Sequence, residues 1–148
     1  FRSTGRRLGE ASPELTAPQF VDLLIDNELL FQEAQRRGLV PSDGSAQAYA
    51  TQNKLALLES MKQDTQQGRE IRDLFAQVKD TPYGIDAYDT GLMLDNVQRA
   101  MAIGAVRTAI GDELPPADVN DRAKRDAHVD AVLAELKDKA TIVTAPVP

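Results

Sequence analysis

The sequence predicts an all-α protein of about five helices with one short strand near its C-terminal end. Apolar residues recur at helical spacing through most of the 148 residues, and glycine, proline and capping residues separate these stretches. A composition of 42% hydrophobic and 27% charged residues provides enough apolar side chains for a folded core. The length suits one domain or two small helical lobes.

The first predicted helix begins after Thr16 and ends at Gly38, because glycine readily adopts the left-handed conformation found at helix ends. Apolar residues in the stretch 20–34 cover well over half of the circumference of this helix. A helix with so wide an apolar surface is usually surrounded by other helices. We therefore expect it to be the central helix of the fold.

Four further helices are expected, over residues 46–67, 71–78, 86–110 and 117–139. Gly68 is expected to interrupt the chain after the second helix, and segment 111–116, with its two prolines, is typical of a linker. Thr141–Thr144 is a run of β-branched residues, which predicts the short strand. The chain is expected to divide into a mobile arm, a helical core, and a linker with the closing helix and strand, over residues 1–15, 16–111 and 112–148.

The composition excludes several kinds of chemistry. The chain has no cysteine, which excludes disulfides, thiol catalysis and cysteine-ligated metal centres. Its 17 basic and 23 acidic side chains give a formal charge of −6, the wrong sign for a protein that binds nucleic acid. Aromatic residues make up only 5% of the chain, so stacking platforms for bases are not expected either.

Few side chains are candidates for catalysis or metal binding. His128, the single histidine, lies between Asp126 and Asp130 in the closing helix, but residues two apart on a helix point away from one another. Asp22 and Asp26 are four apart and share a helix face, but no basic residue is near them in the sequence. We interpret both sets as solvated helix surfaces. The sequence thus predicts a protein that is not an enzyme and that holds no metal or cofactor.

Several short motifs resemble a known protein family. The matching residues are Leu24-Ile25-Asp26, Leu29-Leu30, Glu33-Ala34, Gly38-Leu39, Pro41-Ser42-Asp43, Tyr83-Gly84-Ile85, Asp86, Tyr88, Leu136, Lys139, Ala140, Ile142 and Val143. Over roughly residues 17–144, this pattern resembles the N-terminal chaperone domain of SurA-type periplasmic folding factors, which is related to the substrate-binding lobe of trigger factor.

The resemblance implies an irregular multi-helix chaperone cradle that reversibly binds unfolded or extended polypeptides, without nucleotide or metal. It also implies a location in the periplasm or cell envelope, and a signal peptide or lipid anchor upstream of Phe1 would fit that location. Many family members carry a parvulin isomerase domain with a histidine-bearing strand, which this chain lacks. Leu114-Pro115-Pro116 occupies the place where that domain would be inserted, so no prolyl isomerase activity is expected.

Tyr83, Tyr88, Leu92 and Met93 are the residues that we expect to form a weak peptide-binding wall of the cradle. They follow a predicted turn, and thioether and aromatic side chains can pack against varied apolar shapes. The alternative interpretation is that these residues simply belong to the core.

The predicted strand raises a separate question, because a lone strand leaves backbone amides and carbonyls without partners. We expect Ile142 and Val143 to pair with a removed N-terminal segment, with a second copy of the chain, or with an extended client. A different class of function also remains open. The chain could be a structural or adaptor module that binds one protein partner, as a homodimer that exchanges its closing helix across Pro115-Pro116.

Overall fold

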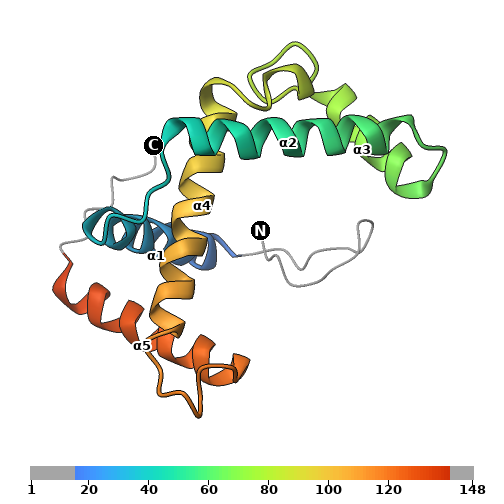
Figure 1. Cartoon of the computed structure of the whole chain (residues 1–148). Coiled ribbons are helices and arrows are strands. Elements are labelled where there is room, and N and C mark those ends of the chain that lie inside the picture. Colours follow the sequence, from blue (N-terminus) through green and yellow to red (C-terminus); the bar gives the residue numbers. More distant parts are fainter. Residues whose placement is uncertain (1–15, 141–148) are drawn as a thin grey trace. The chain divides into compact units, whose positions relative to one another are not determined.

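The computed structural model describes residues 16–140, and within them it is entirely helical, with no strand. The all-α prediction is therefore confirmed for this part of the chain (Figure 1). The helices are α1 (Ala17–Arg36), α2 (Asp43–Lys62), α3 (Gln66–Gln77), the short 3₁₀-helix η1 (Ile85–Ala87), α4 (Gly91–Gly111) and α5 (Arg122–Lys139). The predicted strand at 141–144, with Ile142 and Val143, lies outside the described residues.

The described chain forms two compact units. Unit 1 contains residues 41–99, and unit 2 combines residues 17–40 with residues 100–140. Unit 2 is therefore built from two segments that are far apart in the sequence. Helix α4 begins in unit 1 and ends in unit 2.

The core of unit 2 lies between α1, the second half of α4, and α5. Leu30, Val106 and Ile110 are its largest fully buried side chains, one from α1 and two from α4. Ala34 and Ala102 are also fully buried, and such small side chains allow helices to approach closely. The remaining buried residues of this core are Leu29, Val129 and Leu133.

Helix α1 is central over only part of its length, so the prediction of a fully surrounded helix was wrong. Its buried residues all lie in its second half, between Leu29 and Ala34. In its first half, Phe20, Val21 and Leu24 are 50%, 41% and 51% exposed. An apolar pattern indicates which side chains favour burial, but it does not show whether a neighbouring helix is present to cover them.

In unit 1, α2 and α3 form a helical hairpin, and the structure corrects its predicted boundaries. Helix α2 ends at Lys62 rather than near 67, and α3 begins at Gln66. The side chain of Thr65 caps α3 by accepting a hydrogen bond of 3.0 Å from the amide of Gly68. Gly68 therefore lies inside the first turn of α3 and does not interrupt a helix.

Gly68 is required in this turn because the end of α2 lies directly against it. A Cβ atom at this position would lie 2.5 Å from the carbonyl oxygens of both Ser60 and Gln63. Arg72 also holds the hairpin closed, since its guanidinium donates to the carbonyls of Met61 and Gln63 at the C-terminal end of α2.

The last two helices begin later than predicted. Helix α4 begins at Gly91, because η1 and a turn occupy the residues from Asp86 onward that were expected to be helical. Helix α5 begins at Arg122, where the side chain of Asp121 accepts a hydrogen bond of 3.2 Å from the amide of Lys124. Its end at Lys139 is as predicted.

Candidate functional site

The four residues predicted to form a binding wall lie in unit 1, around η1 and the start of α4. Tyr83 and Leu92 are each 51% exposed, whereas Tyr88 and Met93 are half-buried. The ring of Tyr88 packs edge-on against Phe75 of α3, with centroids 6.5 Å apart and planes at 70°. Tyr88 thus helps to hold η1 to α3. The role of the four residues in binding polypeptide stays a prediction.

A polar cluster positions this segment and was missed by sequence reasoning. The hydroxyl of Thr51 donates to Asp89 Oδ2 at 2.8 Å, and Lys54 Nζ donates to the backbone carbonyl of Asp86 at 3.0 Å. These contacts fasten the residues around η1 to α2. The hydrogen bond from Thr51, and then the nearby Lys54, lowers the pKa of the Asp89 carboxyl below its usual range. Residues so far apart in the sequence leave no local pattern that would predict the contact.

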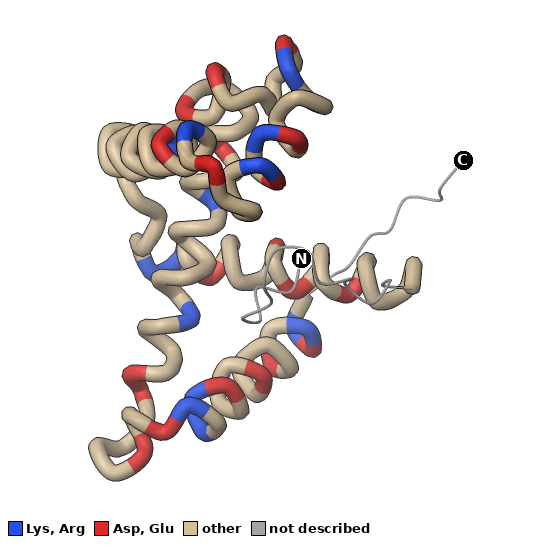
Figure 2. The backbone as a smooth tube through the Cα atoms, turned by 90° about the vertical axis from the view of Figure 1, so that its right-hand side faces the viewer, with Lys and Arg blue, Asp and Glu red and all other residues tan. Residues whose placement is uncertain are grey.

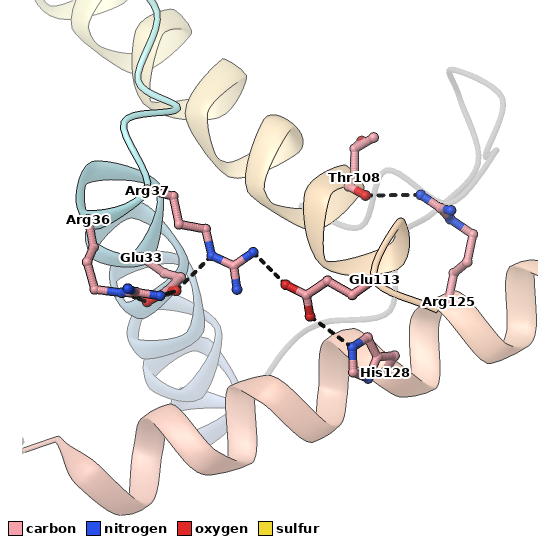
Figure 3. Close-up of polar contacts among 7 residues, drawn as sticks. All are labelled: Glu33, Arg36, Arg37, Thr108, Glu113, Arg125 and His128. Carbon is pink, nitrogen blue, oxygen red and sulfur yellow. Dashed lines mark hydrogen bonds and ion pairs between the residues drawn. The ribbon is translucent and has the colours of Figure 1, made fainter. Parts of the chain in front are cut away.

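A charged network in unit 2 joins the end of α1 to α5 through the turn after α4. Glu33 is only 6% exposed and accepts from Arg36 Nε at 2.9 Å and from Arg37 Nε at 2.8 Å. Arg37 also donates to Glu113 at 2.7 Å, and the opposite oxygen of Glu113 lies 3.1 Å from His128 Nε2. Figure 3 shows the Glu113 carboxylate lying between the Arg37 guanidinium and the His128 ring. We call these five residues the unit 2 charged network.

The electrostatics of the network indicate a structural role. Arg36, assisted by Arg37, lowers the pKa of Glu33 to about 2, although burial acts in the opposite direction. Arg37, and then His128, lower the pKa of Glu113 below its usual range. Both carboxylates are therefore poor proton acceptors at neutral pH. The contacts of the network connect the end of α1, the turn after α4 and α5.

The structure alters the interpretation of two predicted helix surfaces. His128 is half-buried and contacts Glu113, and not Asp126 or Asp130, which are both exposed. Asp26 forms an ion pair of 2.7 Å with Lys137 of α5, so the prediction of a solvated Asp26 was wrong. The hydrogen bond to Asp26 raises the pKa of Lys137 above its usual range. Among the described residues, no cluster of histidine and acidic side chains could hold a metal ion.

Further ion pairs connect α5 to the turn before it. Arg125 lies 2.9 Å from Asp112 and donates at 3.1 Å to the carbonyl of Thr108, in the last turn of α4. Lys124 lies 2.6 Å from Asp118. Helix α5 carries its basic residues near its two ends and its acidic residues mainly between them (Figure 2). Much of the acidic charge in this part of unit 2 is therefore matched by nearby arginine and lysine.

Among the described residues of unit 2, the most exposed apolar surface lies on the first two turns of α1. At about 100° of rotation per residue, Phe20, Val21 and Leu24 centre on the side of α1 nearly opposite the buried Leu30 and Glu33. We call these three residues the α1 outer face. Helix α1 thus has two apolar sides, one that builds the core and one that is exposed. The wide apolar pattern seen in the sequence of α1 includes the residues of both the buried side and the exposed side.

Comparison with models of protein families, with curated proteins and with solved structures found no match to this chain. Within residues 16–140, no helix is both long and apolar enough to cross a membrane.

Proposed function

We propose that this chain is a chaperone-like protein that reversibly binds unfolded polypeptides and has no isomerase activity. The observation that carries the proposal is the α1 outer face, where three large apolar side chains remain between 41% and 51% exposed. Exposed apolar patches of several hundred square ångströms mark sites of interaction with proteins or other apolar partners, and the α1 outer face approaches the lower end of that range. Apolar contact is non-directional, so one surface can accept many sequences.

The size of the α1 outer face favours weak, reversible binding. Three side chains of this kind at half exposure offer on the order of 250 Å² of surface, which corresponds to roughly 6 kcal/mol if it is fully buried. Association costs about 4–15 kcal/mol in lost freedom. This face alone therefore cannot hold a client tightly. Additional contacts made by the client would strengthen binding while leaving it reversible.

We also propose an extracytoplasmic location for this activity. The support comes from the resemblance to periplasmic folding factors and from the absence of cysteine, which fits an oxidising compartment without requiring one. Fractionation of cells that express the protein from its complete reading frame tests this location. Recovery in the cytoplasmic fraction would contradict it.

The test of the function is suppression of aggregation. At equimolar to several-fold excess, the protein is expected to reduce light scattering by at least three unrelated client proteins diluted from denaturant. A Phe20→Ser/Leu24→Ser variant should lose much of this effect, because it removes most of the apolar surface of the α1 outer face. Leu55→Ser is the matched control, since Leu55 is 61% exposed on α2 of unit 1.

The same assay separates the proposal from the adaptor alternative. An adaptor for one partner would protect none of the three clients, and that result would reject the chaperone function. A second variant, Tyr83→Ser/Leu92→Ser, tests whether the predicted peptide-binding wall in unit 1 contributes to the suppression of client aggregation. Both variants change exposed side chains, so their helical content by circular dichroism should equal that of the wild type.

A further inference from the structure

The unit 2 charged network contains one group that changes its charge near neutral pH. Histidine is the side chain that ordinarily gains or loses a proton between pH 5 and 8, and His128 is the single histidine of the sequence. The carboxylates of the network stay ionised over this range, because the pKa of Glu33 is about 2 and the pKa of Glu113 lies below its usual range. Its arginines stay protonated. A change of charge within the network between pH 8 and 5 can therefore come only from His128.

The position of His128 makes this change of charge matter to the contact between α5 and the turn after α4. Its Nε2 atom lies 3.1 Å from Glu113 Oε2, while Arg37 donates at 2.7 Å to Glu113 Oε1. Figure 3 shows the Glu113 carboxylate between the two. A neutral imidazole that carries its proton on Nε2 makes this contact as an ordinary hydrogen bond. Protonation of the ring turns it into an ion pair, and hydrogen bonds between charged groups are shorter and stronger.

Nearby cations oppose protonation of the imidazole, so the partners of those cations decide the balance. Arg37 is shared between Glu33 and Glu113. Arg125 pairs with Asp112 and points towards Thr108 in Figure 3, and Lys124 pairs with Asp118. The charged residues of the segments around His128 are Glu33, Arg36 and Arg37 at the end of α1, Arg107 on α4, Asp112, Glu113 and Asp118 before α5, and Lys124, Arg125, Asp126 and Asp130 on α5. Among the described residues, only Glu113 lies within hydrogen-bonding distance of the imidazole, so its charge acts most directly.

We propose that His128 is a pH-dependent clasp of unit 2, whose protonation fastens α5 more firmly to Glu113 and, through Arg37, to the end of α1. The folded chain then holds this proton more tightly than the unfolded chain. The stabilisation is accordingly present in mild acid and is lost as the pH rises through the range in which histidine loses its proton. This range lies above the acidic one in which Glu33 is protonated. The inference is independent of the proposed function, since it concerns how firmly unit 2 is held together.

Urea denaturation of the full chain, without a polyhistidine tag, at pH 8 and pH 5.5 measures the clasp. The unfolding equilibrium constant of the wild type, relative to that of His128→Gln, is expected to fall roughly threefold from the higher pH to the lower. The change is modest because the Glu113 side chain is 42% exposed. Glutamine keeps a hydrogen-bond donor but does not titrate, and the comparison cancels the terminal amine, which also titrates near this range. Amide exchange around Val129 and Leu133, corrected for its intrinsic pH dependence, should slow by a similar factor in the wild type only.

Two charge variants locate the effect. Glu113→Gln keeps the histidine but should abolish the pH dependence, and it replaces His128→Gln as the reference if that variant does not fold. Asp126→Asn/Asp130→Asn is the matched control, since it changes the two exposed carboxylates on either side of His128 and should retain the pH dependence. A ratio of equilibrium constants that is equal at the two pH values, or a pH dependence that persists in Glu113→Gln, overturns the clasp. A ratio that rises in acid also overturns it, because it would show that the neighbouring cations outweigh Glu113.

Discussion

Glu33 is the most buried charged residue that the structure describes, and its environment contributes to the response of unit 2 to acid. Its two arginine partners follow at i+3 and i+4, Arg36 in the last turn of α1 and Arg37 directly after it, so this part of the network could be recognised from the sequence. The continuation could not be recognised, because Arg37 meets Glu113 across 76 residues of chain. No local pattern of charges specifies a partner that only the packed fold brings close.

The lowered pKa of Glu33 predicts a loss of stability in acid. Arginine contacts move its pKa from 4.5 to about 2, so between these pH values the unfolded chain binds a proton that the folded chain does not. The stabilisation is thus complete above about pH 4.5 and disappears as the pH falls towards 2. Glu33→Gln should lower the free energy of unfolding by about 1–3 kcal/mol at neutral pH.

Urea denaturation at pH 7, 4 and 3 measures this dependence. The difference between the wild type and Glu33→Gln should shrink as the pH is lowered, because protonation removes the same charge that the substitution removes. Glu59→Gln is the control, since Glu59 is largely exposed and pairs only with the exposed Lys62. If the difference in the free energy of unfolding between the wild type and Glu33→Gln stayed constant from pH 7 to pH 3, the lowered pKa of Glu33 would be contradicted.

At the level of elements, the sequence predicted which segments are helical better than where they end. The amphipathic spacing of α3 and the apolar stretches of α1, α4 and α5 were sufficient to identify those helices. Gly68 was misinterpreted, because a glycine in a helical pattern can indicate either a break or a close contact. Only the position of the end of α2 shows that the second explanation applies.

The α2–α3 hairpin should be sensitive to a single methyl group at Gly68. Gly68→Ala places a Cβ atom against two backbone carbonyls that cannot move aside without opening the hairpin, which should cost about 1–3 kcal/mol. Gly44→Ala is the matched control in the first turn of α2, where a Cβ atom would meet nothing within 4 Å. That substitution should be neutral or stabilising by up to about 1 kcal/mol, because alanine is the better helix former. Equal destabilisation of the two variants in urea denaturation would contradict this explanation.

At the level of the whole molecule, the division into two units was beyond what the sequence pattern could predict. Unit 2 joins α1 to the second half of α4 and to α5, with residues 41–99 of unit 1 between them in the sequence. Periodicity identifies the apolar sides of α1, α4 and α5 separately, but it does not pair them. The exposure of the first half of α1 could not be predicted for the same reason, because an apolar pattern does not show how far the neighbouring helices extend along α1.

Because each unit has its own buried residues and its own polar contacts, we expect the two units to open separately under native conditions. Gly68→Ala should accelerate amide hydrogen exchange in α2 and α3 and leave the protected amides around Val129 and Leu133 in α5 unchanged. Glu33→Gln should accelerate exchange around Val129 and Leu133 and leave exchange in α2 and α3 unchanged. Helix α4 begins in unit 1 and ends in unit 2. Amide exchange should therefore accelerate in its first half in Gly68→Ala and in its second half in Glu33→Gln. If either substitution accelerated exchange equally in both units, the chain would unfold as one cooperative body, and α4 would be the rigid element that couples its halves.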